Sequence, residues 1–560
     1  MGGRMLRSWL ERPLLSVTAI VKRNAAVAAL VENTIAREEL TAALTGLGDM
    51  ERLIGRIVYG TAGGRDMVSL RAAIERLPAL REQLTAFSGG RLAELAGELE
   101  DLTEIGEHIG AAICDEPPFS VREGGFIRDG YHEEVDRLRR IMNGGKGVLA
   151  EIEAKEKEKT GIRTLKIGYN KVFGYYIEVS NSFKDQVPDT YIRKQTLVNG
   201  ERYITQELKD LEHEILTASD RVVALEYELF TQLRQEISAQ SARIQRTAAA
   251  VAELDALVSF AAVAVRNHYC RPTVDESGVI EIHDGRHPVV EQMLKDSLFV
   301  PNDTFMGEKE DRVAIITGPN MAGKSTYMRQ VALIVLMAQM GAFVPAASAR
   351  IGVVDRIFTR IGASDDLSAG QSTFMVEMTE VADILRHATK HSLLILDEIG
   401  RGTSTFDGMS IARAVLEYCA DKKLLGAKTL FATHYHELTE LENTLPGTVN
   451  YNIAVKTRGE DIIFLRKILP GGADRSYGIE VAKLAGLPES VVRRARAVLK
   501  ELEESSGHRP QLLAAPQQDQ VSLEALGEAE VIDRLRRTQP DTLSPMEALN
   551  LLYELKQKLP

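Results

Sequence analysis

The sequence predicts a multidomain α + α/β fold, in which a helical core carries a small β-rich insertion and is followed by an α/β domain with a mostly parallel sheet. Three observations predict it. Apolar residues recur every three to four positions in the first part of the chain. Aromatic and β-branched residues alternate with polar ones between 165 and 203. From Pro272 onward, short apolar runs alternate with helical patterns.

Length and composition indicate a modular protein of ordinary globular type. A chain of 560 residues is too long for one hydrophobic core, and 44% hydrophobic with 26% charged residues match soluble globular proteins. No stretch reaches the ~20 uninterrupted apolar residues that a bilayer span requires, and the first residues lack the apolar segment of a signal peptide. We therefore expect a cytoplasmic protein with no membrane partner.

Charge and cysteine usage limit the possible partners and sites. The net charge of −12 counts against a broadly basic surface, so any contact with DNA must be made by a local basic patch. Cys114, Cys270 and Cys419 are far apart and form no CxxC pair. This spacing argues against a zinc site and against a disulfide framework.

The helical core is predicted in two parts, at residues 1–157 and 218–271. Glycine and proline pairs separate the helices of the first part. Residues 158–217 form the β-rich insertion, in which Leu165–Ser180 is typical of a β-hairpin and Tyr191–Leu197 adds a second extended stretch. We therefore expect long helices to lead into and out of the insertion.

The α/β domain is predicted at residues 272–505. A polar linker at 506–520 follows it, and a short helical tail occupies 521–560. The linker composition predicts a separation between the α/β domain and the tail.

The strongest motif lies between a predicted strand and a predicted helix of the α/β domain. Gly318–Ser325 fits GxxxxGK[ST], whose glycines allow consecutive N–H groups to form an anion nest. Lys324 should reach the β- and γ-phosphates, and the Ser325 hydroxyl should bind Mg²⁺. We therefore expect ATP and Mg²⁺ as cofactors, with the nucleotide held by Gly318, Pro319, Met321, Ala322, Gly323, Lys324, Ser325 and Thr326.

Two further predicted strands end at polar residues that could join this site. Leu393–Asp397 is an apolar strand followed by Glu398, at the edge where open α/β sheets bind ligands. Asp397 should hold Mg²⁺, while Glu398 should orient and deprotonate the attacking water. His434 ends the next strand and could contact the γ-phosphate or that water. A packed histidine at a strand end is the alternative for His434.

These motifs stand in a recognisable order. Asp365–Met378 lies between the phosphate loop and the acidic strand, and Gly400–Gly408 follows that strand. The order resembles the ABC-type ATPases. The residues of these motifs are similar to those of the MutS family of mismatch-repair ATPases, above all TGPNMAGKSTYMRQ at 317–330 and ATHY at 432–435. The similarity covers nearly the whole chain.

The resemblance implies a function and a set of partners. It implies an ABC-type ATPase domain at 272–505, a lever formed by the helical core, and a DNA clamp at 158–217. The expected activity is that of a DNA-dependent ATPase of mismatch repair, which couples ATP binding and hydrolysis to clamp opening and closing. Double-stranded DNA, a second copy of the chain and downstream repair proteins would be its partners, at the nucleoid. The tail at 521–560 would allow tetramers.

Further site residues follow from the resemblance. Phe299 would stack on adenine and Asn320 would contact the nucleotide, while Ser372 and Thr373 would reach the γ-phosphate bound by the partner subunit. From the residues alone, a core position is the alternative for Phe299. A helix N-cap position is the structural interpretation of Ser372 and Thr373, and it is compatible with the role in the partner's site. The expected contacts with the DNA backbone are Lys166, Lys171, Arg193, Lys194 and Arg202, for which a solvated surface is the alternative.

The beginning of the chain departs from the family pattern. Family members carry a mismatch-reading domain and a connector domain before this core, and neither is visible in the sequence. We therefore expect DNA binding that does not recognise mismatches. A short relative acting on branched DNA, another ABC-type ATPase and a catalytically silent scaffold are the alternatives, and intact Lys324, Asp397 and Glu398 disfavour the last.

Overall fold

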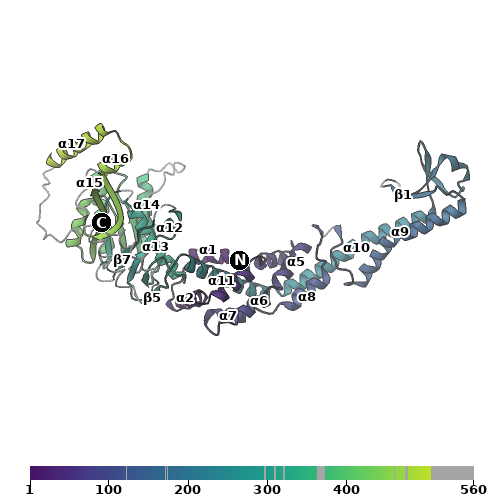
Figure 1. Ribbon diagram of the computed structural model, residues 1–560, viewed down its shortest axis with the longest axis horizontal. Helices are drawn as coiled ribbons and strands as arrows, with labels where there is room; N and C mark the ends of the chain where they lie inside the picture. Colours follow the sequence, from purple (N-terminus) through teal and green to yellow (C-terminus); the bar gives the residue numbers. More distant parts are fainter. Residues whose placement is uncertain are drawn as a thin grey trace, which may run out of the picture. The chain divides into compact units, whose positions relative to one another are not determined.

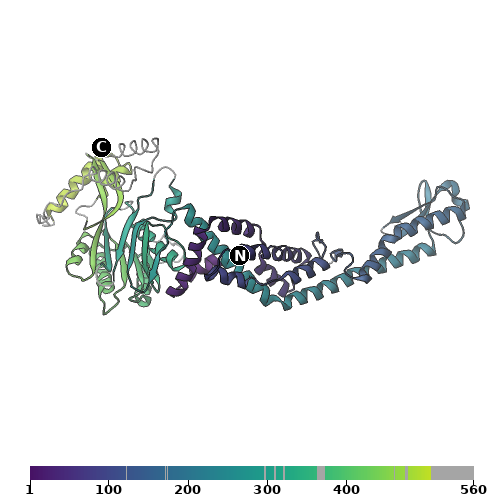
Figure 2. The same cartoon turned by 60° about the horizontal axis from the view of Figure 1, so that its bottom comes forward.

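The structure is a computed structural model that describes residues 1–120, 123–170, 172, 174–294, 298–307, 311–319, 322–361, 373–458, 461–472 and 477–505. The chain divides into two compact units, Met1–Ser476 and Tyr477–Pro560. Helical and α/β parts follow one another as expected (Figures 1 and 2), so the coarse fold class is confirmed. Predictions for Lys171, Asn320, Met321, Ser372, the linker and the tail lie outside the described residues.

The helical part begins with short helices whose ends follow local sequence signals. Ser16, Asn33 and Asp49 each accept a hydrogen bond from a backbone N–H of the first helical turn, as N-cap residues do. The helices are α1 (Gly2–Glu11), α2 (Val17–Glu32), α3 (Thr34–Leu44), α4 (Met50–Val58), α5 (Gly64–Ile74), α6 (Leu77–Leu84), α7 (Gly90–Glu98) and α8 (Thr103–Ala112).

Helix α11 (Ser241–Arg266) lies at the centre of this part. It contacts α1, α2, α3, α4 and α7, and small buried residues along it allow these helices to approach closely. By length and composition α11 is apolar enough to cross a membrane, yet 56% of its most apolar stretch is buried inside the protein. We interpret it as the core helix that the other helices need in order to bury their apolar faces.

Two long helices, α9 (Glu133–Thr160) and α10 (Gln206–Ala239), run side by side and flank a small sheet (Figures 1 and 2). The sheet is antiparallel, with the order β1-β2-β4-β3. Its strands are β1 (Lys166–Asn170), β2 (Gly174–Ser180), β3 (Ile192–Thr196) and β4 (Gly200–Ile204), and the short helix η2 (Asn181–Gln186) follows β2. Ile177 and Val179 pack with Ile152 of α9 and Leu208 of α10, so both helices share the core of the sheet.

The α/β part contains a six-stranded sheet of order β10-β11-β12-β8-β13-β14, in which only the β13–β14 pair is antiparallel. Alternate residues of its strands enter two separate hydrophobic clusters. Helix α13 (Lys324–Gln339) covers one face, and α14 (Thr373–His387) and α15 (Thr405–Ala420) cover the other. The strands are β8 (Val313–Thr317), β10 (Ile357–Arg360), β11 (Leu393–Asp397), β12 (Lys428–Ala432), β13 (Thr448–Arg458) and β14 (Asp461–Pro470).

The α/β part also contains a second, smaller sheet, which was not foreseen from the sequence. It has the order β5-β9-β6-β7 and mixes one parallel pair with two antiparallel pairs. Its short strands are β5 (Thr273–Asp275), β6 (Ile280–Gly285), β7 (Asn302–Met306) and β9 (Ser348–Gly352). The short helix α12 (Val290–Met293) lies between β6 and β7 in the chain, and η4 (His436–Asn443) follows β12. The second unit contains α16 (Gly478–Leu484) and α17 (Glu489–Ser505).

The C-terminal end of α13 is tied to the helical part. Gln339 donates a hydrogen bond to the Leu14 carbonyl at 3.0 Å, and its own backbone carbonyl accepts the Leu14 N–H at 3.1 Å. Arg23 of α2 donates to the Met340 carbonyl at 2.9 Å. A displacement of α13 would therefore also move Leu14 and α2, to which its C-terminal end is hydrogen-bonded.

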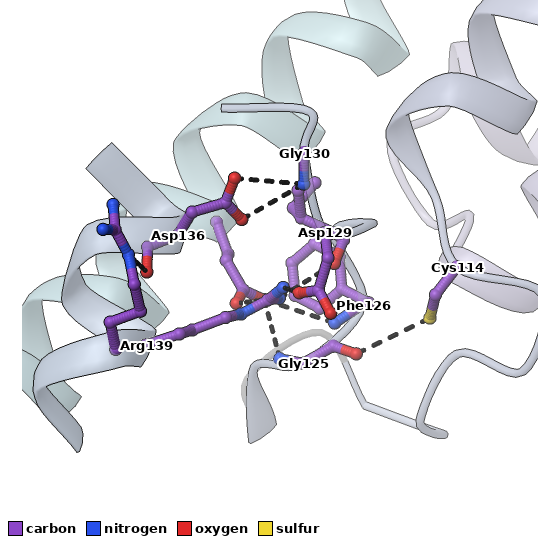
Figure 3. A network of polar contacts seen from close by, with 10 residues as sticks. Cys114, Gly125, Phe126, Asp129, Gly130, Asp136 and Arg139 are labelled. Atoms are coloured by element: carbon purple, nitrogen blue, oxygen red, sulfur yellow. Dashed lines mark hydrogen bonds and ion pairs between the residues drawn. The ribbon is translucent and has the colours of Figure 1, made fainter. Parts of the chain in front are cut away.

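A buried carboxylate joins α10 to α9 and to the loop before it, and Figure 3 labels its partners Gly125, Phe126 and Arg139. Glu226 of α10 is 1% exposed, and its Oε2 accepts the N–H groups of Gly125 at 2.6 Å and Phe126 at 3.2 Å. Its Oε1 accepts a hydrogen bond from Arg139 of α9 at 2.7 Å. Arg139 also donates to the Ile127 carbonyl, so one ion pair fixes two helices and a loop.

Replacing this carboxylate should loosen the joint. Glu226→Ala leaves Arg139 with only Asp129 and the Ile127 carbonyl, and it removes the acceptor of the buried Phe126 N–H, which should lower the free energy of unfolding by about 1–3 kcal/mol. We expect faster amide hydrogen exchange at residues 123–131, measured by mass spectrometry. Glu228→Ala, on an exposed position of the same helix, is the control and should leave exchange unchanged. Equal protection in both variants would contradict the assignment.

Candidate functional site

The phosphate loop connects β8 to α13 and needs glycine at both of its ends. Gly318 has φ 134° and Gly323 has φ 111°, in the left-handed region that residues with a Cβ adopt only with strain. Helix α13 begins at Lys324, so the unpaired N–H groups of its first turn face the loop. This geometry suits a phosphate group.

Lys324 is 3% exposed, and its Nζ donates to the carbonyl of Gly318. The same Nζ lies 3.5 Å from His434 Nε2. Burial lowers the pKa of Lys324 to about 8, while the charges of Glu398 and Asp397 oppose that shift. A buried ammonium with one carbonyl partner can gain strong interactions from an anionic ligand.

Asp397 and Ser325 meet at the end of β11. Ser325 Oγ donates to Asp397 Oδ2 at 2.5 Å. The other oxygen, Oδ1, is buried and has no hydrogen-bond partner among the described residues. Burial is the main reason that the pKa of Asp397 is raised. A hydroxyl and a desolvated carboxylate with a free lone pair fit a hard divalent cation such as Mg²⁺.

Glu398 stands beside this pair, with its carboxylate held by two basic groups. His434 Nε2 lies 2.8 Å from Glu398 Oε1, and Arg401 donates to Oε2. The hydrogen bond from His434 is the largest cause that lowers the pKa of Glu398, to about 2. The carboxylate is therefore ionised, with one oxygen turned toward His434 and the other toward Arg401.

A cavity of about 290 Å³ opens beside Gly323 and the first turns of α13. Phe299 is half-buried and lines it. The cavity therefore brings Phe299 next to the phosphate loop. The other lining residues are Val290, Leu294, Val300, Asn302, Thr326, Tyr327, Gln330 and Arg466.

The structure brings most of the predicted residues together. Lys324, Ser325, Asp397, Glu398 and His434 form one cluster, with Pro319 and Ala322 buried in the loop beside it. Thr373 is exposed at the first residue of α14, and it has no contact with this cluster that the structure records.

Sequence reasoning missed several residues of the site. Arg401 contacts Glu398, and Arg466 lines the cavity from the distant strand β14. Arg401 lies only three residues after Glu398, in the segment Gly400–Gly408, and this closeness in sequence could have indicated its position. Arg466 is far from every motif, and no local pattern indicates its position.

The predicted basic residues of the small sheet differ in their surroundings. Lys166 and Lys194 are exposed. Arg202 is only 20% exposed, donates to Glu178 at 3.0 Å and lies over the Tyr176 ring at 4.3 Å. Arg193 pairs with Glu201 at 3.3 Å. The two lysines are therefore the better placed of the four for contact with a polyanion.

Family models match three regions of the chain. The model described as MutS domain III matches residues 1–261, and MutS domain V matches residues 314–503. The model of the DNA mismatch repair protein MutS C-terminal region matches residues 524–558. The matches cover the helical part, most of the α/β part and the tail.

Curated relatives are similar along the whole chain. The DNA mismatch repair protein MutS of Ruminiclostridium cellulolyticum is 53% identical over all of this chain and 65% of its own length. The protein of the same name from Symbiobacterium thermophilum is 54% identical over all of this chain and 64% of its own. That of Lachnoclostridium phytofermentans is 57% identical over 90% of this chain and 54% of its own. The chain thus spans about two thirds of the length of the first two relatives.

Proposed function

The chain belongs to the MutS family, and we propose that it is a DNA-dependent ATPase of DNA mismatch repair. One observation carries the proposal. The phosphate loop, the Ser325–Asp397 pair and the Glu398–His434 pair come together at the ends of three parallel strands. That constellation is the one an ABC-type P-loop ATPase requires.

In the proposed reaction, Lys324 and the N-terminus of α13 bind the β- and γ-phosphates of ATP. Ser325 and Asp397 hold Mg²⁺, which would supply charge stabilisation for the phosphate oxygens when bound. Phe299 stacks on the adenine, and Asn320 adds a contact from the loop.

Glu398 is the proposed base that orients and deprotonates the attacking water. A carboxylate held by both His434 and Arg401 is a weak base. We therefore propose that Arg401 leaves Glu398 when nucleotide binds, while His434 senses the γ-phosphate. Release of one cation would raise the basicity of Glu398 at the moment when the water is in place.

The proposed partners are duplex DNA, a second copy of the chain and downstream repair proteins. The small sheet clamps the DNA backbone, principally through Lys166 and Lys194. Ser372 and Thr373 of one subunit complete the ATP site of the other, and the tail at 521–560 pairs dimers into tetramers. α9 and α10 form the lever between the clamp and the helical core. The protein would act in the cytoplasm, at the nucleoid.

The first test is ATP hydrolysis by the full chain with Mg²⁺, with and without duplex DNA. Glu398→Ala removes the proposed base and should lower kcat by about 10²- to 10⁴-fold. Glu417→Ala removes a partly exposed carboxylate of α15 whose recorded partner is Arg413, so it is the control and should behave as the wild type. Wild-type hydrolysis that Glu398→Ala leaves intact would overturn the proposed base, and a rate that ignores DNA would overturn the proposed coupling.

Nucleotide binding should depend on pH through Lys324. Its pKa of about 8 means that the ammonium loses its proton as the pH rises past 8, whereas binding of a triphosphate needs the charged form. We expect affinity for ATP to fall by up to about tenfold between pH 8 and pH 9. Calorimetry at pH 8 in two buffers of different ionisation enthalpy should show proton uptake on binding. Binding without proton uptake would refute this assignment.

DNA binding should distinguish the exposed lysines from the paired arginine. Lys166→Ala and Lys194→Ala should each weaken binding and reduce the slope of log Kd against log salt by about 1, because each removes one phosphate contact. Arg202→Ala should destabilise the sheet instead, since it removes the partner of Glu178. Lys390→Ala, exposed in the α/β part, controls for net charge. An equal effect of Lys390→Ala would argue against the clamp.

A further inference from the structure

Glu398 has an unusual backbone conformation for a residue with a side chain. Its φ is 54°, in the left-handed region, where a β-carbon crowds the following carbonyl. Strained residues persist only where the surrounding structure holds them. The contacts that hold Glu398 therefore determine where its carboxylate points.

Three hydrogen bonds fix the backbone on either side of this strain. The Glu398 N–H donates to the Ala432 carbonyl at 2.9 Å. Two residues later, the Gly400 N–H donates to Glu377 Oε1 at 2.6 Å, and the Gly400 carbonyl accepts from the Tyr435 hydroxyl at 3.0 Å. The peptide that enters Glu398 and the two peptides on either side of Gly400 are thus held in place.

The turn is also enclosed sterically. A Cβ on Gly400 would lie 2.3 Å from the Gly408 carbonyl oxygen, and one on Gly402 would lie 3.0 Å from the Cβ of Phe374. Phe374 belongs to the first turn of α14, the helix that also carries Glu377. The turn that contains Arg401 is therefore packed against α15 at Gly400 and against α14 at Gly402.

Glu377 is built into the domain as a fixed anchor. It is 5% exposed, and its second oxygen lies 3.5 Å from the guanidinium of Arg360, which is itself buried at the end of β10. Arg360 also pairs with Glu380, one turn further along α14, at 3.0 Å. Glu380 is 47% exposed and has no recorded contact with Gly400.

We propose that Glu377 is a positioning residue for Glu398. By holding the Gly400 N–H, it keeps the strained turn in place and sets the orientation of the Glu398 carboxylate toward the attacking water. Glu377 lies four residues after Thr373 on α14. A shift of that helix would therefore move the Gly400 N–H through its hydrogen bond to Glu377, and with it the backbone two residues after Glu398. This inference rests on the proposed function, in which Glu398 is the base.

The test compares steady-state hydrolysis and binding of a fluorescent ATP analogue by the full chain with Mg²⁺. Glu377→Ala should lower kcat by about 10- to 100-fold, because a small misplacement of a catalytic group has effects of that size. The Kd for the analogue should stay within about threefold, since Glu377 does not touch the nucleotide site. Tyr435→Phe, which removes the second anchor of Gly400, should lower kcat in the same direction.

Two variants separate positioning from loss of stability. Glu377→Gln retains an oxygen that accepts the Gly400 N–H and should restore kcat to within a few-fold of the wild type. Glu380→Ala disturbs the same arginine without touching the turn and should leave kcat unchanged. Expression and Tm of each variant are measured alongside. If Glu377→Ala does not fold, Glu377→Gln and Tyr435→Phe still test the inference.

The outcomes are distinct. A wild-type kcat in Glu377→Ala, or equal losses in Glu377→Ala and Glu380→Ala, would overturn the positioning role while leaving the ATPase proposal intact. If Tyr435→Phe also kept a wild-type kcat, the turn would have no influence on Glu398. A wild-type chain without Glu398-dependent hydrolysis would overturn both proposals.

Discussion

The parallel pairing of β8, β11 and β12 is the constraint on which the site depends. In this register Asp397 is level with Ala432, and Ala432 is level with Ile316. The phosphate loop, the two acids and His434 therefore leave the sheet at the same edge, although more than a hundred residues separate the first from the last. Apolar residues that alternate between two helical layers fix that register, because a slip by one residue would exchange the two faces.

Bringing these groups together at one edge of the sheet buries several charges close to one another. Lys324 and Asp397 are both buried, and burial shifts the pKa of each toward its neutral form. Glu398 is kept ionised by the hydrogen bond from His434 and by the Arg401 guanidinium, one at each oxygen. The site is thus a set of charges that compensate one another only partly, so an anion beside Lys324 and a cation beside Asp397 would both be stabilised there. Sites with such shifted groups are typical of catalysis.

Part of this arrangement could be predicted from the sequence, because some of it is local. Lys324 and Ser325 lie in one continuous motif, and Asp397 and Glu398 directly follow an apolar strand, so each reveals its position through its neighbours. Arg466, Glu377 and Tyr435 could not be assigned in this way, since they approach the site only through tertiary contacts. Glu226 is a similar case: a glutamate in the middle of a long polar helix is typical of a solvated face, and only the fold shows that it is buried.

The length of α10 has a mechanical consequence. Its 34 residues span about 50 Å at 1.5 Å per residue. Leu208, near one end, belongs to the core of the small sheet, while Phe230, Leu233 and Ile237, near the other, belong to the core of the helical part. Because α10 is one unbroken helix with each end held in a different hydrophobic core, it can act as a rod between them. A tilt of a few degrees in the helical part therefore becomes a displacement of several ångströms at the sheet, without any change in the sheet itself.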